Sequence, residues 1–247
     1  SDGTQEYLCQ LATESKSIKF VRNEIPQGGA GARNTGIGIA QGSFIAFLDD
    51  DDVWLPEKLE YQIDALKSEP DASAVSCWFH IEAANGARSL IRLHAPADTQ
   101  EILRSNHLGG ASMCLTTKSY VDAIGGFDPV LRSGQDWDLW IKLHDKGRVL
   151  VCETPLVCYL PHNGVRITSN PSAVYGGRRR VYIRYKDRMS DHTRQSHLAE
   201  LIYCRKVLLR VGAFNKIAGV FAVLRFCGVL RGSRYLYRYV RDTINWR

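Results

Sequence analysis

The sequence predicts an α/β fold in which helices flank a sheet, followed by a helical, basic C-terminal region. Five apolar residues in a row, Phe44 to Leu48, precede a run of charges, which is typical of a strand buried on both faces. Asn85-Gly86 lies between two apolar segments and is a strong hairpin signal. The chain has 247 residues, 45% of them hydrophobic, which is enough for a globular core.

The N-terminal segment contains two weak elements and a glycine-rich stretch. Ser1 to Thr4 resembles the end of a strand that turns into a helix, and Ile18 to Val21 predicts a short strand. Gln27 to Gly36 predicts a loop that leads into a short helix ending at Gly42. It lacks the third glycine of a dinucleotide fingerprint and the lysine of a P-loop. Arg33 in this stretch could contact phosphate or form a salt bridge with an aspartate.

Four consecutive carboxylates, Asp49 to Asp52, follow the predicted strand. They repel one another, and they lie at the carboxyl end of a strand, where open α/β sheets bind ligands. Side-chain alternation along a strand predicts that Asp49 and Asp51 point to the same side. Such a pair can hold one divalent cation together with substrate phosphates. The alternative is a solvated acidic turn.

The remaining elements follow from periodicity and turn signals. After Pro56, a helix is predicted whose apolar face consists of Leu55, Leu59, Ile63 and Leu66. The other predicted strands are Val75 to Ile81, Arg88 to Leu93, Met113 to Thr116, Val149 to Val151 and Leu156 to Tyr159. The other predicted helices are Gln100 to Ser105, Tyr120 to Ile124, and one that begins near Gln135.

Two further polar residues are candidates for chemistry. Asp136 lies in the first turn of the amphipathic helix that carries Trp137 and Trp140. It could simply favour the helix dipole, or it could accept a proton from a substrate, whereas Asp138 is expected to be an ordinary dipole partner. His162 lies in the polar loop Pro161 to Ser169, where it is either solvent-exposed or a ligand contact.

Charge divides the chain into two predicted parts, 1–170 and 171–247. Residues 175–247 hold 17 lysines and arginines against 4 acidic residues. These basic helices could dock on the body, bind an anionic membrane surface or bind nucleic acid; we favour the membrane surface and expect no nucleic acid. The seven cysteines show no C-x-x-C spacing, and no long apolar run spans a membrane. We therefore expect a cytoplasmic protein, peripheral on the inner face of the cytoplasmic membrane.

As a set, these motifs resemble those of the family 2 glycosyltransferases. The matching segments are Ser1-Asp2-Gly3-Thr4, Ala32-Arg33-Asn34 with Gly36, Leu48-Asp49-Asp50-Asp51-Asp52, Gly126-Phe127-Asp128 and Gln135-Asp136-Trp137, with His162 and Thr168 downstream. The resemblance implies a GT-A-type mixed sheet. It also implies that Asp136 is the catalytic base and that Asp51, with Asp49, holds the metal. The nucleotide-sugar-binding residues it implies are Asp2, Arg33, Asn34, Asp49, Asp50 and His162.

By this resemblance the protein is expected to be a metal-dependent inverting enzyme. It would use Mg²⁺ or Mn²⁺ to transfer a sugar from a nucleotide-sugar donor, expected to be UDP-linked. The acceptor would be a hydroxyl of a saccharide or lipid-linked molecule in surface polysaccharide synthesis. The alternatives are a degenerate, non-catalytic scaffold and a nucleotidyltransferase, although the glycine-rich stretch lacks the lysine of the latter.

Two departures from the family pattern carry further expectations. The family's first strand, helix and second strand are missing before Asp2, which predicts that the chain is a fragment and that Ile18 to Val21 loses its strand partners. Leu160 stands where relatives often carry an arginine, which weakens the predicted role of the His162 loop at the diphosphate.

Overall fold

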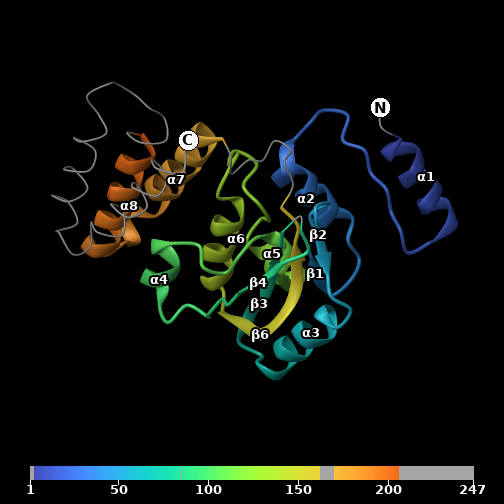
Figure 1. Ribbon diagram of the computed structural model, residues 1–247, viewed down its shortest axis with the longest axis horizontal. Coiled ribbons are helices and arrows are strands. Elements are labelled where there is room, and N and C mark those ends of the chain that lie inside the picture. The colour runs from blue at the N-terminus through green and yellow to red at the C-terminus, as the bar shows by residue number, and fades with distance from the viewer. Residues whose placement is uncertain (1–2, 84, 162–169, 206–247) are drawn as a thin grey trace.

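A mixed sheet forms the centre of the protein, and helices cover both of its faces (Figure 1). The computed structural model describes residues 3–83, 85–161 and 170–205. The strand order is β1-β5-β3-β6-β2, and β4 pairs with β3. The strands are β1 (Phe44–Ala46), β2 (Asp52–Trp54), β3 (Ala72–Glu82), β4 (Arg88–Ile91), β5 (Leu115–Thr117) and β6 (Arg148–Tyr159).

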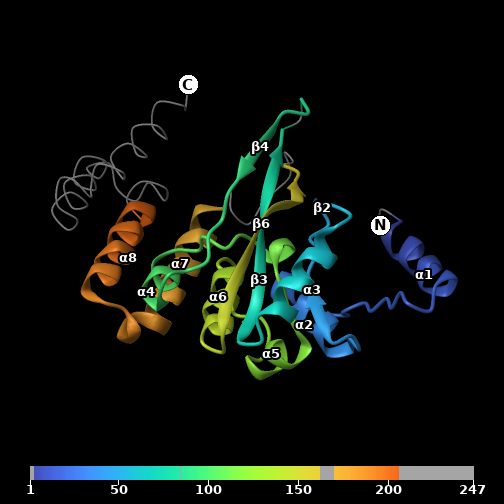
Figure 2. The ribbon, with the colours of Figure 1, turned by 90° about the horizontal axis from the view of Figure 1, so that it is seen from below.

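Helices lie on both sides of this sheet, and α1 stands apart from it (Figure 1). They are α1 (Thr4–Glu14), α2 (Gly28–Ile39), α3 (Lys58–Ser68), α4 (Thr99–Arg104), α5 (Lys118–Ala123), α6 (Gln135–His144), α7 (Pro171–Tyr185) and α8 (Asp191–Tyr203), with short 3₁₀ helices η1 (Ala111–Met113) and η3 (Lys186–Arg188). Helices α4, α6, α7 and α8 lie on one side and α3 on the other (Figure 2). Neighbouring core residues show this division, because Ala74 belongs to the α6 cluster and Val75 to the α3 cluster.

The centre of the sheet is the long parallel pair β3 and β6, and the other strand pairs are antiparallel. The predicted mixed sheet is therefore confirmed. So is the hairpin of β3 and β4, where Gly86 has φ +80°. The two strands predicted at 149–151 and 156–159 form one strand, β6, whose register shifts near Trp78 and Pro155 instead of breaking.

The acidic strand differs from its prediction. β1 has three residues rather than five and lies at the edge of the sheet, paired only with β5 among the described strands. Leu48 is 52% exposed, so the expectation of a strand buried on both faces is wrong. After Phe47 the chain leaves the sheet and forms a turn in which the Asp52 N–H donates to the Asp49 carbonyl at 3.1 Å. Strand alternation therefore does not determine where the aspartates point.

The N-terminal segment also differs from its prediction. Residues 18–21 form no strand, as expected for a segment without its strand partners, and they connect α1 to α2. The glycine-rich stretch is part of α2 rather than a loop, and the helix ends at Ile39 before Gly42. At Gly31 a Cβ atom would lie 2.3 Å from the Gln27 Cβ, so glycine makes room for that side chain. Helix α1 buries none of its residues.

Helix α3 buries a different face from the one predicted. The buried residues are Lys58, Gln62 and Leu66, whereas Leu59 is 41% exposed. Gln62 Nε2 donates to the carbonyls of Met113 at 2.8 Å and Val75 at 3.3 Å, and Lys58 Nζ donates to Gln62 Oε1 at 2.6 Å. The need of buried carbonyls for hydrogen-bond donors, rather than the spacing of apolar residues, thus determines which face of α3 is buried. Burial lowers the pKa of Lys58.

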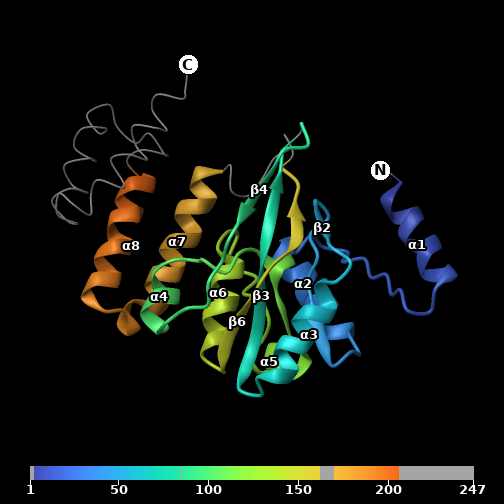
Figure 3. The ribbon, with the colours of Figure 1, turned by 60° about the horizontal axis from the view of Figure 1, so that its bottom comes forward.

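The first two helices of the basic region pack against the body, as Figure 3 shows. Val181, Tyr185 and Met189 belong to the same apolar core as Trp137 and Trp140. Arg184 pairs with Asp128 and Asp138, and Arg188 pairs with Asp145. The docking interpretation therefore accounts for α7 and α8. Residues 206–247 of the predicted basic part lie outside the described residues.

Within 3–83, 85–161 and 170–205, no helix is both long enough and apolar enough to cross a bilayer.

The packing of α7 generates a testable pair of variants. In Gly177→Ala a Cβ atom would lie 2.2 Å from the Ser133 carbonyl oxygen, whereas at Gly176 nothing lies within 4 Å. We expect Gly177→Ala to lower the free energy of unfolding by about 1–3 kcal/mol through overpacking. Gly176→Ala should raise it by up to about 1 kcal/mol through helix propensity. Urea denaturation of both variants measures the difference, and equal effects would contradict the docking of α7 on residue 133.

Candidate functional site

A cleft of about 890 Å³ opens beside the acidic turn, within the size range of small-molecule sites. It is formed by α2, the turn after β1, the ends of β3 and β6, the segment before β5, and the segment leading into α6. Its lining residues are Gly29, Ala32, Arg33, Leu48, Asp49, Asp50, Asp51, Asp52, Phe79, Ile81, Asn106, Gly110, Met113, Arg132, Ser133, Gly134, Gln135, Asp136 and Tyr159. The acidic turn and Asp136 thus line the same cleft, although they are 84 positions apart at the nearest.

The acidic turn is fixed by a buried serine. Ser112 Oγ accepts from the Asp49 N–H at 3.1 Å, and the Ser112 carbonyl accepts from Trp54 Nε1 at 3.0 Å. Ser112 is fully buried in η1, so these bonds tie the turn to the segment that precedes β5. All four aspartates line the cleft, and Asp50 is the most open of them to solvent.

Arg33 bridges the acidic turn and the start of α6. Its Nη2 forms an ion pair with Asp49 Oδ1, and its Nη1 donates to Gln135 Oε1 at 3.2 Å. The guanidinium also lies over the Phe127 ring, 5.3 Å from the centroid. The structural salt bridge is therefore observed. Because Arg33 also lines the cleft, its contact with phosphate stays a prediction.

Asp136 lies in the first turn of α6, after Gly134 with φ +75°. Its Oδ1 is buried and has no hydrogen-bond partner among the described residues. Burial raises the pKa of Asp136 to about 6; Arg33 lowers it, Asp49 raises it, and hydrogen bonds from the backbone of Asp136 and Ala111 lower it. A carboxyl group with a pKa near neutrality, facing a cleft, is a candidate acid or base.

Asp138 has a larger role than the helix-dipole partner that was predicted. Its side chain is fully buried, and Oδ1 accepts from Arg184 Nη1 at 2.6 Å and from the Tyr185 hydroxyl at 2.8 Å. Lys142 Nζ lies 3.2 Å from Oδ2. Asp138 is thus the centre of a buried ion cluster that joins α6 to α7.

Asn34 is placed differently from the other predicted nucleotide-sugar-binding residues. Its Nδ2 donates to the Phe127 carbonyl and its Oδ1 accepts from the Phe127 N–H, both at 2.8 Å. Asn34 does not line the cleft, so the structure favours a role in positioning the Gly126-Phe127-Asp128 segment. Asp2 and His162 lie outside the described residues, and their roles stay predictions.

Sequence reasoning missed several residues of the cleft. Arg132 is exposed there and forms no ion pair with a described carboxylate. A cation two residues before Gly134 was a signal that could have been noticed. Ser112 had no such signal, because it acts through a bond to a residue more than 60 positions away. Gln135 lies in the recognised Gln135-Asp136-Trp137 segment, but its contact with Arg33 could not be read from that segment.

The aspartates fit a hard divalent ion. Carboxylate oxygens suit Mg²⁺ and Mn²⁺, and Mg²⁺ sites typically use one or two carboxylates with water and substrate phosphates. Within the described residues the acidic turn does not bring three ligand atoms within 4.8 Å of one another. Its chemistry therefore fits an ion whose coordination is completed by a bound diphosphate.

Comparison with known proteins identifies the family. The family described as "Glycosyl transferase family 2" matches residues 1–127, about half of the chain. The chain belongs to glycosyltransferase family 2. Arg33, the acidic turn and Gly126-Phe127 lie within the matched residues.

Individual relatives agree with this assignment. The chain is 31% identical over 150 residues to a putative teichuronic acid biosynthesis glycosyltransferase, TuaG, of Bacillus subtilis, covering 60% of this chain and 58% of TuaG. Over 66 residues it is 46% identical to the Escherichia coli enzyme WfgD, named UDP-Glc:alpha-D-GlcNAc-diphosphoundecaprenol beta-1,3-glucosyltransferase, covering 27% of this chain and 25% of WfgD. The chain spans about half the length of the curated relatives it matches.

The fold is also found among solved structures. That of S. aureus TarS 1-349 in complex with UDP-GlcNAc superposes with a TM-score of 0.63 at 17% identity, covering 92% of this chain and 69% of that one. At this identity the comparison concerns the fold, and it agrees with the GT-A-type mixed sheet expected for this family 2 chain.

The raised pKa of Asp136 generates a prediction on stability. The folded-state pKa of about 6 lies above the ordinary 3.8, so protonation favours the folded state. The stabilising contribution is complete below about pH 4 and is lost as the pH rises through about 6. Relative to Asp136→Asn, the wild type should lose up to about 3 kcal/mol of unfolding free energy across this window.

Urea denaturation at stepped pH measures that difference. Asp64→Asn, which removes an exposed aspartate of α3, is the matched control and should show no such trend in this window. A difference between wild type and Asp136→Asn that stays constant from pH 4 to pH 7 would contradict the raised pKa.

Proposed function

We propose that this family 2 protein is a metal-dependent inverting glycosyltransferase. It transfers a sugar from a nucleotide-sugar donor, a UDP-sugar, to a hydroxyl of a saccharide or lipid-linked acceptor in surface polysaccharide synthesis. The observation that carries the proposal is that the acidic turn and Asp136 line one cleft. Two relatives support these substrate classes by their names. WfgD is named for UDP-Glc and a diphosphoundecaprenol-linked sugar, and TuaG for teichuronic acid biosynthesis.

On the donor side, Asp51 would hold Mg²⁺ or Mn²⁺ with help from Asp49. Such an ion supplies charge neutralisation at the leaving diphosphate. Asp50 and Arg33 line the same part of the cleft and would contact the nucleotide sugar. Arg132, an exposed guanidinium in the cleft, joins them as a candidate phosphate contact.

On the acceptor side, Asp136 would take the proton of the attacking hydroxyl. With a pKa of about 6, it is a stronger base than an ordinary aspartate and is still ionised at neutral pH. The hydroxyl oxygen bonds to the anomeric carbon as the bond to the diphosphate breaks, and the proton moves to Asp136. This single displacement inverts the anomeric configuration.

The division of roles between Asp51 and Asp136 is testable in the full-length protein. Both Asp51→Asn and Asp136→Asn should reduce transfer from a UDP-sugar, the latter by about 10²- to 10⁴-fold as a general base is lost. Only Asp51→Asn should weaken Mn²⁺-dependent binding of UDP, measured by calorimetry. Asp64→Asn, outside the cleft, should retain both activities.

Two results would reject this assignment. Equal UDP affinity in Asp51→Asn and the wild type at saturating Mn²⁺ would remove Asp51 from the metal site. Full transfer activity in Asp136→Asn would remove the proposed base.

We also propose that the C-terminal region, residues 171–247, holds the protein on the inner face of the cytoplasmic membrane. The support is the excess of 17 basic over 4 acidic residues in 175–247. Arg178 and Arg184 of α7 and Arg188 of η3 are already paired, with Glu200, Asp128, Asp138 and Asp145. Membrane attraction would therefore depend on the other basic residues of 171–247.

Sedimentation with liposomes tests this surface. Full-length protein should bind vesicles of anionic lipid at low salt and be released as salt rises, because screening weakens the attraction. Vesicles of zwitterionic lipid are the control and should bind much less. A protein that stays in the supernatant with anionic vesicles at low salt would return the whole region to a docking role.

A further inference from the structure

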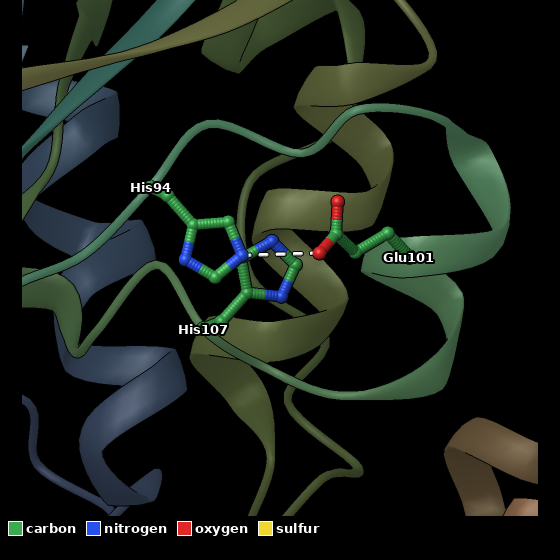
Figure 4. Close-up of side chains that lie close together, drawn as sticks. All are labelled: His94, Glu101 and His107. Carbon is green, nitrogen blue, oxygen red and sulfur yellow. Dashed lines mark hydrogen bonds and ion pairs between the residues drawn. The ribbon is translucent and has the colours of Figure 1, made fainter.

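Three potential metal ligands meet outside the cleft described above (Figure 4). His94 follows β4, Glu101 lies in α4, and His107 lies in the segment after α4. Each offers one ligand atom, and the three atoms lie within 4.8 Å of one another. Among the described residues this is the one group of three or more such side chains. No part of the proposed transfer reaction uses it.

The hydrogen bonds of His107 leave one ring nitrogen ready to bind a cation. Its Nδ1 lies 3.1 Å from the Ser105 carbonyl, which can only accept, so Nδ1 carries the proton. In that tautomer Nε2 has a free lone pair, and Nε2 is buried with no hydrogen-bond partner among the described residues. A backbone carbonyl that accepts from the far nitrogen is the usual arrangement behind a metal-bound histidine.

Glu101 is also held in the form that binds cations. Its Oε2 accepts from the Ala97 N–H at 2.8 Å, and its Oε1 lies 3.0 Å from His94 Nε2. These two bonds, the first being the stronger influence, keep the pKa of Glu101 below its ordinary value. Burial lowers the pKa of His107. Two hydrogen bonds thus hold the Glu101 carboxylate in place beside the histidines.

The third ligand gives access from solvent. The His94 side chain is 63% exposed, and its ring stacks on that of His107 with centroids 4.6 Å apart. Arg104 approaches Glu101 only to 4.0 Å, so no close cation already occupies the carboxylate. A metal between Glu101 and His94 would replace the proton that these two groups now share.

We propose that His94, Glu101 and His107 form a second metal site, which takes a late first-row divalent cation of the Zn²⁺ type. Two imidazole nitrogens and one carboxylate suit Zn²⁺, with water in the remaining position, whereas Mg²⁺ and Ca²⁺ prefer oxygen ligands. The site therefore differs in chemistry from the all-carboxylate acidic turn.

Its position links the ion to the wall of the cleft. Asn106, next to His107, donates to the Gly109 carbonyl at 3.0 Å and accepts from the Leu108 N–H at 3.0 Å. Asn106 and Gly110 both line the cleft. An ion that joins His107 to Glu101 would fix this segment between α4 and η1, and so would order one wall of the cleft from outside it.

Calorimetric titration of the untagged full-length protein with Zn²⁺ tests the proposal. Excess Mg²⁺ in the buffer keeps the acidic turn from contributing. We expect one Zn²⁺ per chain, and a visible Co²⁺ spectrum of a low-coordinate nitrogen and oxygen site. His107→Ala and the exposed His94→Ala should each weaken affinity by about 100-fold or more, since losing even an outer-shell partner costs roughly 10- to 100-fold.

His192→Ala is the matched control, because it removes an exposed histidine of α8 outside the cluster. It should bind Zn²⁺ as the wild type does. Hydrogen exchange of the amides of residues 105–113 should slow on adding Zn²⁺ in the wild type but not in His94→Ala. Absence of stoichiometric Zn²⁺ binding, or wild-type affinity in His94→Ala, would overturn the site, and so would a loss of affinity in His192→Ala.

Discussion

The buried carboxylate of Asp138 determines how helix α6, which carries Asp136, is held against α7. Two cationic side chains, Arg184 and Lys142, and the Tyr185 hydroxyl surround it, so the charge is compensated on every side that the protein provides. Removing Arg184 would leave the fully buried Asp138 charge without its nearest cation, which is unfavourable. Helix α6 is therefore held against α7 in one orientation. Asp136, two residues earlier, lies about 200° around the helix and faces the cleft as a consequence.

The two aspartates of α6 show how environment divides similar groups into different roles. Asp138 forms ion pairs with Arg184 and Lys142 and serves packing, whereas Asp136 lines the cleft and has a pKa raised by burial. A carboxyl group with a raised pKa in a cleft is typical of a functional site. Arg33 connects the two walls of the cleft, because it contacts Asp49 on one wall and Gln135 on the other.

Local patterns in the sequence predicted the hairpin and the helix of Asp136, and the family resemblance implied that the acidic residues and Asp136 serve one site. They failed where long-range contacts decide the outcome. The buried face of α3 follows the carbonyls of Val75 and Met113, which lie in other strands and segments. The roles of Asn34 and Ser112 likewise depend on partners 93 and 63 residues away, which periodicity and propensity cannot reveal.

The ion pair between Arg33 and Asp49 has a consequence for ligand binding. Before any donor arrives, each charge already has an opposite charge beside it, so neither has to be left bare in a half-buried position. If Asp49 bound a cation, the Arg33 guanidinium would be free to contact a phosphate. Asp49, the cation, Arg33 and the phosphate would then each still have an opposite charge beside them. If the proposed metal and donor bind here, the ion pair would lower the electrostatic cost of binding them.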